Sequence, residues 1–324
     1  MKSLKIGRYP EVVVEDLPVP AAGPGQVVMR VDAVTTCPQW DLHLKHDEPM
    51  FVGHKFQYPY TTGQPGHEAS GVIHEVGDGV LGFAPGQRVS AWRDVGHHVP
   101  GCYAQYVLLD AQNVIAVPEH LSPQATAPVE LAMCVAASVM MLKQMNVLAG
   151  KRVGITGLGP AGLIAAQMAR AEGATEVIGF DTADNRCAYA VEKGIVNAAY
   201  SPDAVDDIFP ARPRRAAIHT AIDCVGAKRS VEWTMDRTHD AVALFGVQRE
   251  AYSFLPRHYH PPLRLCGYPG HSYEAAQYAV SLLEAGTLDL LPLITHELPL
   301  EEYVKGIDLL ETQLAIKICF LPWA

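Results

Sequence analysis

The chain has 324 residues, more than a single hydrophobic core usually holds, so we expect two domains. A formal net charge of −10 at pH 7 disfavours nucleic acids and anionic membranes as partners, which leaves small molecules. We also expect a cytoplasmic protein with reduced thiols. The N-terminus lacks the apolar core of a signal peptide, no run of about 20 apolar residues follows, and the seven cysteines form no Cys-x-x-Cys pair.

A β-rich region extends from the N-terminus to about residue 126. Short runs of Val, Ile and Leu alternate with Gly and Pro turns, which is typical of strands joined by loops. The predicted strands are 12–14, 26–31, 71–76, 88–90 and 103–108. From about residue 127 the composition changes to Ala and Met, and residues 131–144 predict a helix.

The second half of the chain alternates strands with helices. The predicted strands are 152–156, 176–180, 216–223 and 241–246, with a helix at 187–193 between the second and the third. Short strands separated by helical stretches imply parallel pairing through crossover connections. Residues 273–285 predict a further helix, and residues 316–320 predict a closing strand.

A glycine-rich turn, Gly157-x-Gly159-x-x-Gly162, lies between a predicted strand and a helix predicted at 163–172. Glycines there permit a tight turn and let a pyrophosphate approach the helix N-terminus, where free N–H groups and the helix dipole favour anions. The turn, which includes Pro160 and Ala161, therefore predicts dinucleotide binding, and a plain turn before a helix is the alternative.

The same glycine spacing occurs at Gly77, Gly79 and Gly82. There the chain continues as Phe-Ala-Pro-Gly, in which no helix can begin cleanly. We interpret this copy as a turn between strands.

Asp181 ends the strand that follows the glycine turn, 19 residues after Gly162. A carboxylate at that distance can accept hydrogen bonds from both ribose hydroxyls and would repel a 2′-phosphate, so it favours NAD over NADP. The nearby Arg186 weakens this preference. The alternative is that Asp181 only caps the next helix.

Potential zinc ligands occur at Cys37, His67, Glu68, Glu130 and Cys134. A catalytic zinc site needs about three ligands of the Cys, His and carboxylate types, with one position open for substrate. Taken alone, a cysteine is more often a small buried hydrophobe, and a histidine is more often a surface or core residue.

Several motifs, in order, resemble the zinc-dependent medium-chain alcohol and polyol dehydrogenases over nearly the whole chain. The motifs are Cys37 with Asp41-Leu42-His43, Gly66-His67-Glu68-Ala69-Ser70-Gly71, Val76-Gly77, Pro85-Gly86-Gln87-Arg88-Val89, the glycine turn, Asp223-Cys224-Val225-Gly226, and Pro292-Leu293-Ile294-Thr295-His296 with Leu298-Pro299-Leu300.

The resemblance implies an α/β fold with two domains. A GroES-like, β-rich catalytic domain would comprise residues 1–126 and 269–324, and a Rossmann domain with a doubly wound parallel sheet would comprise residues 127–268 and bind NAD. The family also implies a homodimer or homotetramer.

The resemblance further implies that Cys37 and His67 bind a catalytic zinc, with Glu68 beside the metal as an alternate ligand or hydrogen-bond partner. Glu130 resembles the third ligand of the polyol and sugar dehydrogenases, and Cys134 resembles that of simple alcohol dehydrogenases. We favour Glu130. One zinc per subunit is expected, because residues 91–101 lack the cysteine cluster of a structural zinc lobe.

A proton relay through His43 is implied if Asp41 is the anchor of the motif, although His46 is also close. Asp41 could orient a metal-bound histidine. The cysteine loop has one extra residue before Asp41 compared with the family. The expected cofactor contacts are Gly157, Gly159, Pro160, Ala161, Gly162, Asp181, Arg186 and Val225, and the candidate pocket residues are Trp40, Phe51, His54, Trp92 and His97.

The implied activity is hydride transfer between a secondary alcohol and NAD, with zinc acting as a Lewis acid on the substrate oxygen. A polyol, sugar or cyclitol is favoured if Glu130 is a ligand. The alternatives are a zinc-free quinone or enone reductase of the same superfamily and a non-catalytic NAD-binding protein.

Overall fold

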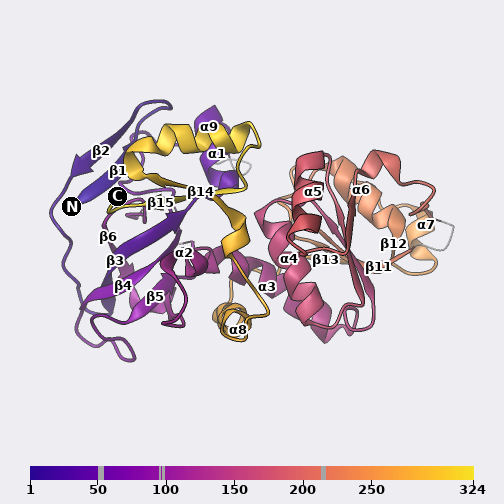
Figure 1. Ribbon diagram of the computed structural model, residues 1–324, viewed down its shortest axis with the longest axis horizontal. Coiled ribbons are helices and arrows are strands. Elements are labelled where there is room, and N and C mark those ends of the chain that lie inside the picture. Colours follow the sequence, from indigo (N-terminus) through magenta and orange to yellow (C-terminus); the bar gives the residue numbers. More distant parts are fainter. Residues whose placement is uncertain (50–54, 95, 97–98, 213–216) are drawn as a thin grey trace. The chain divides into compact units, whose positions relative to one another are not determined.

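The computed structural model describes residues 1–49, 55–94, 96, 99–212 and 217–324 (Figure 1). The described chain forms two compact units, one comprising residues 1–131 and 290–324 and the other residues 132–289. The sequence placed these divisions at 126/127 and 268/269. The predicted pocket residues Phe51, His54 and His97 lie outside the described residues.

The first unit is built on a mainly antiparallel sheet with the strand order β14-β15-β3-β4-β5-β7, and β6 also pairs with β3. The central strand β3 is rich in valine, and its apolar residues are buried because both sheet neighbours and the core enclose it. The strands are β3 (Gln26–Thr35), β4 (Glu68–Val76), β5 (Arg88–Ala91), β6 (Tyr106–Asp110), β7 (Val114–Ala116), β14 (Ile294–Pro299) and β15 (Lys317–Leu321). A separate antiparallel pair consists of β1 (Lys2–Ile6) and β2 (Val12–Asp16).

The C-terminal segment completes the first unit, and Figure 1 shows it in yellow among the indigo and purple N-terminal elements. Strands β14 and β15 are parallel, so a helix must connect them, and α9 (Tyr303–Glu311) does so. Strand β15 then pairs antiparallel with β3. Helix α9 packs beside α1 (Pro38–His46), where Lys45 Nζ lies 2.5 Å from carboxylate oxygens of both Asp308 and Glu311.

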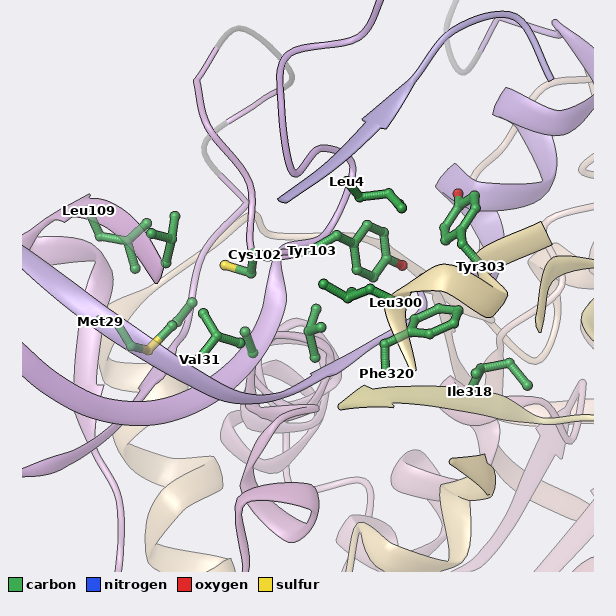
Figure 2. Close-up of a cluster of buried hydrophobic side chains, with 14 of the residues drawn as sticks. Leu4, Met29, Val31, Cys102, Tyr103, Leu109, Leu300, Tyr303, Ile318 and Phe320 are labelled. Carbon is green, nitrogen blue, oxygen red and sulfur yellow. The ribbon is translucent and has the colours of Figure 1, made fainter. Parts of the chain in front are cut away.

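The hydrophobic core of the first unit joins residues from both ends of the chain. Figure 2 shows Leu4, Met29 and Val31 packed in the same cluster as Leu300 and Phe320. The short helix α2 (Pro123–Thr126) lies in this unit, and the 16-residue helix α3 (Val129–Gln144) begins in it and continues into the second unit. The first unit therefore depends on its last 35 residues for part of its core and two of its strands.

The second unit contains a six-stranded parallel sheet with the order β10-β9-β8-β11-β12-β13. Numbered from β8, this order is 3-2-1-4-5-6, which is the doubly wound dinucleotide-binding arrangement and confirms the predicted Rossmann fold. The strands are β8 (Arg152–Thr156), β9 (Glu176–Phe180), β10 (Ala198–Tyr200), β11 (Ile218–Asp223), β12 (Thr238–Leu244) and β13 (Arg264–Gly267). The helices are α4 (Pro160–Ala171), α5 (Asp184–Glu192), α6 (Lys228–Arg237), α7 (Pro256–Tyr259) and α8 (Tyr273–Glu284).

Candidate metal and cofactor sites

Cys37 follows the last residue of β3 by two positions and is the N-cap of α1. Pro38 occupies the first turn of that helix, where its fixed φ is compatible with helix initiation and its missing N–H is not needed. The Cys37 N–H donates a 2.9 Å hydrogen bond to Asp41 Oδ2, which lies in the first turn of α1. The bond fixes the backbone at the point where strand becomes helix.

His67 and Glu68 reach the same place because of the register between β3 and β4. Thr35 pairs with Glu68 in antiparallel fashion, so the residue preceding Glu68 faces the segment that follows Thr35. The buried ring of His67 places Nδ1 2.8 Å from the carbonyl oxygen of Pro65. A carbonyl can only accept, so Nδ1 carries a proton, and in the neutral ring Nε2 has the lone pair that binds a metal.

The donor atoms of Cys37, His67 and Glu68 all lie within 4.8 Å of one another. Glu130, in the first turn of α3, places Oε2 3.9 Å from His67 Nε2. Nitrogen and oxygen ligands each lie about 2.0–2.2 Å from a zinc ion, so two atoms separated by 3.9 Å can share one ion. The thiolate, imidazole and carboxylate donors also match the preferences of zinc.

Negative groups surround His67. Burial alone would lower its pKa, but Asp94, Cys37 and Glu130 together raise the pKa of His67 well above 6.5. Burial also raises the pKa of the Cys37 thiol, against the opposing hydrogen bond with His67. The cluster therefore attracts positive charge, which either a proton or a metal ion can provide.

Glu68 is held by a buried lysine that sequence reasoning did not single out. Lys317 Nζ lies 2.6 Å and 2.5 Å from the two carboxylate oxygens of Glu68 and donates its remaining hydrogen bond to the Thr36 carbonyl. Thr35 Oγ1 also donates to Glu68 Oε2, at 3.1 Å. The donor atom of Glu68 also lies within 4.8 Å of those of Cys37 and His67, so both roles expected for Glu68 stay predictions.

Asp41 was expected to orient a metal-bound histidine. Its carboxylate instead accepts hydrogen bonds from the Cys37 N–H and from the hydroxyls of Tyr103 and Tyr303. Burial raises the pKa of Asp41 to about 6, although the two tyrosine hydrogen bonds act in the opposite direction. The carboxylate facing His67 Nδ1 belongs to Asp94, at 3.9 Å.

The other residues predicted near the metal fall into different environments. The ring of His43 places Nδ1 3.0 Å from the Glu48 carbonyl oxygen, whereas His46 pairs with Glu311 at 2.6 Å. Trp40 lines a small recess with His67 and Asp94. The indole of Trp92 donates a 2.8 Å hydrogen bond to the Gln112 carbonyl oxygen and is buried. The proton relay stays a prediction.

Cys134 stands four residues after Glu130 in α3, so the two side chains lie on the same face of that helix. The 3.9 Å separation between Glu130 and His67 favours Glu130 as the third donor.

The glycine turn of the second unit follows β8 at the point where the strand order reverses. Gly157 has φ of 85°, and a Cβ at Gly162 would lie 1.8 Å from the Gly157 carbonyl oxygen, so both positions require glycine. Gly159 is the N-cap of α4, and Pro160 begins the helix with Ala161 after it. The free N–H groups of α4 therefore face the turn, as an anion site requires.

Asp181 lies directly beyond β9 and beside this turn. Its carboxylate accepts hydrogen bonds from Leu158 N–H at 2.7 Å and Ala183 N–H at 2.9 Å, and Arg186 approaches it at 3.9 Å. The Ala183 contact lies at the entry to α5, whose N-cap is Ala183 and not Asp181, while the Leu158 contact ties Asp181 to the glycine turn. Val225 is half-exposed, and its Cγ2 would lie 2.7 Å from a Cβ at Gly157.

The second glycine pattern connects β4 with β5 and forms no helix in the described chain. Gly79 and Gly82 have φ of 76° and 85°. The spacing therefore indicates a nucleotide site only when a strand precedes it and a helix follows it.

Residues 23–119 match the family model of the alcohol dehydrogenase GroES-like domain. The chain is similar to the L-threonine 3-dehydrogenase of Legionella pneumophila subsp. pneumophila (strain Philadelphia 1), with 28% identity and 100% coverage of both proteins. Among solved structures, it resembles galactitol-1-phosphate dehydrogenase from Escherichia coli (TM-score 0.83, 22% identity, 99% and 100% covered). It also resembles 2R,3R-butanediol dehydrogenase from Bacillus subtilis (TM-score 0.84, 22% identity, 99% of each chain covered).

Proposed function

We propose, from the premise that this chain belongs to the zinc-dependent medium-chain alcohol and polyol dehydrogenases, that it oxidises a small polar secondary alcohol with NAD. The observation that carries the proposal is the gathering of donor groups around His67. Its donor atom lies within 4.8 Å of those of Cys37 and Glu68, and its Nε2 lies 3.9 Å from Glu130 Oε2. The glycine turn and Asp181 of the second unit provide the complementary cofactor chemistry.

In the proposed site, Cys37, His67 and Glu130 hold the zinc. The bound zinc supplies Lewis-acid polarisation of the substrate oxygen, and NAD supplies the hydride acceptor. Pro65 fixes the orientation of His67 through Nδ1, and Lys317 neutralises Glu68 beside the donors. These residues keep the donor atoms in place so that the alcohol meets a preorganised, water-poor centre.

NAD is the proposed cofactor because Asp181 directly follows β9 and its carboxylate lies beside the glycine turn. A 2′-phosphate would place negative charge against this carboxylate. Arg186 offers one compensating cation at 3.9 Å from Asp181. We therefore expect NAD to bind more tightly than NADP, and comparison of the two dissociation constants tests this order.

The substrate is proposed to carry a polar group beside the reacting carbinol. The carboxylate donor Glu130 favours a polyol, sugar or cyclitol, while the curated relative from Legionella pneumophila is named for L-threonine. A panel of polyols, cyclitols, 2,3-butanediol and L-threonine, assayed by NADH absorbance, separates these classes. No reduction of NAD with any of them, in protein that holds zinc, would contradict the proposed class.

The first experiment is the zinc content per subunit, measured by elemental mass spectrometry. We expect about one zinc, because residues 91–101 carry no cysteine cluster for a structural metal. The described donors form two candidate groups, Cys37-His67-Glu68 and Glu130-Cys134-His271, and the 3.9 Å contact between His67 and Glu130 joins them. Cys37→Ala should remove both the zinc and the activity. Cys266→Ala is the matched control, since Cys266 lies in β13 against Met145. Full activity of Cys37→Ala would contradict the assignment of Cys37 as a zinc ligand.

The third ligand is tested by Glu130→Gln and Cys134→Ala. If Glu130 binds the metal, only Glu130→Gln lowers the zinc content, because its amide is a poorer zinc ligand than a carboxylate. Loss of zinc from Cys134→Ala alone would instead assign Cys134.

We further propose that the protein, which is soluble and acts on a small molecule, is a cytoplasmic homodimer or homotetramer. Light scattering after size exclusion measures the number of subunits, and a monomer at micromolar concentration would contradict the assembly.

A further inference from the structure

We propose that Tyr103 and Tyr303 are positioning residues that act through Asp41 to hold Cys37 in its metal-binding geometry. This inference rests on the proposed function, in which Cys37 is a zinc ligand. It assigns a role to two tyrosines whose hydroxyls lie in the core of the first unit.

Three hydrogen-bond donors from different parts of the chain meet at the Asp41 carboxylate. Tyr303 Oη donates to Oδ1 at 2.7 Å, Tyr103 Oη donates to Oδ2 at 3.0 Å, and the Cys37 N–H donates to Oδ2 at 2.9 Å. Asp41 is only 1% exposed. A buried carboxylate needs such donors, because it has lost its hydration, and its position is therefore determined by theirs.

The tyrosines themselves are rigidly placed. Tyr103 precedes β6 and Tyr303 begins α9, and both are essentially inaccessible to solvent. Figure 2 shows their rings beside Phe320, and the ring centroids of Tyr103 and Tyr303 lie 5.5 Å and 5.6 Å from that of Phe320. The ring packing fixes where each hydroxyl can lie.

Both hydroxyls remain donors under ordinary conditions. Burial and the neighbouring Asp41 raise the pKa values of Tyr103 and Tyr303 well above 10. Each phenol therefore keeps its proton and offers it to the carboxylate.

The path from the tyrosines to the thiol is short. Cys37 lies between the end of β3 and the start of α1, and its N–H is bound by the same Asp41 oxygen that accepts from Tyr103. A shift of Asp41 would rotate the N-cap backbone and move the Sγ relative to His67. Metal sites lose affinity when such supporting hydrogen bonds are removed, even though the ligands remain.

The test uses Tyr303→Phe and Tyr103→Phe in the full-length protein, which delete one hydroxyl each and retain the ring. We expect the zinc dissociation constant, measured by competition with a chromogenic chelator, to rise roughly 10-fold to 100-fold. The thiolate-to-metal charge-transfer band of the cobalt-substituted protein should also change in intensity, because it reports the Cys37 bond to the metal.

Tyr9→Phe is the matched control. Tyr9 Oη donates to Asp308, on the same helix as Tyr303, at 2.9 Å, and Tyr9 is more exposed than Tyr303. This variant should keep the wild-type zinc affinity and the wild-type cobalt spectrum.

Folding is checked in each variant by the thermal midpoint of the metal-free protein and by NAD binding to the second unit. If one phenylalanine variant does not fold, the same two measurements are made on the other and on Asp41→Asn. The side-chain amide oxygen of the new asparagine can still accept a hydrogen bond from the Cys37 N–H, so Asp41→Asn removes the carboxylate charge and keeps an acceptor. Wild-type zinc affinity and spectra in the folded variants would overturn the inference. Absence of zinc binding in the wild type would instead overturn the proposed function.

Discussion

Glu68 and Lys317 form an ion pair that is almost completely removed from solvent, with exposed side-chain fractions of 1% and 0%. The pair connects two residues that are 249 positions apart in the sequence. Desolvation of two charges is costly, and only their contact and the additional hydrogen bonds from Thr35 and to Thr36 offset it. Replacing one partner should therefore lower the free energy of unfolding more than replacing both.

We predict that Lys317→Met destabilises the metal-free protein by about 3–5 kcal/mol, because Glu68 is left buried without its cation. Urea unfolding gives the free energy of unfolding. The double variant Glu68→Gln with Lys317→Met should recover a substantial part of this loss. The explanation would be contradicted if the double variant lost as much free energy of unfolding as Lys317→Met and Glu68→Gln lose together when each is made alone.

His219 in β11 gives a prediction about pH. Its Nδ1 accepts a hydrogen bond from the Arg152 N–H at 3.1 Å, and partial burial, with Lys151 nearby, lowers the pKa of His219 below 6.5. For a histidine with a depressed folded-state pKa, stability is complete above the unfolded pKa and decreases as the pH falls below it.

The wild-type free energy of unfolding should therefore fall as the pH drops below about 6.5, and His219→Asn should lack this decrease. Asparagine retains an acceptor for the Arg152 N–H without a titratable group. The measurement is the difference in unfolding free energy between the two proteins as a function of pH. A difference that does not vary with pH would exclude His219 as its source.

In the strand–turn–helix element of β8 and α4, two glycines have different functions. One is needed for packing and the other for the approach of the cofactor. Gly162 is required by packing, since its Cβ would lie 1.8 Å from the Gly157 carbonyl oxygen. At Gly159 the nearest atom to such a Cβ is Arg186 Nη1, at 4.0 Å, and φ is −75°. An alanine therefore fits the protein at Gly159, while its methyl group would occupy the approach of a pyrophosphate.

We expect Gly162→Ala to lower the free energy of unfolding by about 1–3 kcal/mol. Gly159→Ala should leave it unchanged or slightly higher, and should weaken NAD binding at least about tenfold. Thermal unfolding and calorimetric titration with NAD distinguish the two effects. Tight NAD binding by Gly159→Ala would show that the pyrophosphate does not approach this turn.

The whole molecule shows which features a sequence can predict. The Rossmann strands, the glycine turn and the alternation of β8 and α4 depend on local patterns, and the structure confirms this fold. Strands β1, β7, β10, β13 and β14 were missed. The first four have only three to five residues, and β14 includes His296, Glu297 and a proline.

The buried residues that support the metal cluster, Tyr303 and Lys317, could not be predicted for a different reason. Tyr303 contacts Asp41 across 262 positions, and nothing local indicates that contact. Lys317 did leave one signal, since a lysine within the apolar run Ile-Lys-Ile-Cys-Phe needs a buried partner. The identity of that partner comes only from the register of β15, β3 and β4.

Helix α3 also needs the whole structure for its interpretation. Residues 123–144 are apolar and long enough to cross a membrane, but 78% of the apolar window is buried inside the protein. The segment, which comprises α2 and α3, is therefore explained as part of the buried interior.

At the scale of the whole molecule, we predict two separate footprints in hydrogen exchange. NAD should protect residues 157–162 and 181–186, and zinc should protect residues 37–41 and 66–68, because a ligand at 100 times its Kd stabilises its folded site by about 2.7 kcal/mol. In Cys37→Ala the zinc footprint should vanish while the NAD footprint stays. Loss of both footprints in that variant would contradict the assignment of the two ligands to separate units.

The return of the chain to the first unit after residue 289 has a consequence for biosynthesis. All six strands of the parallel sheet leave the ribosome before β15 is translated. Cys37 and His67 are synthesised early, long before Tyr303 and Lys317. The second unit can therefore finish folding on the nascent chain. The metal cluster acquires its buried supports only after these later residues have been synthesised.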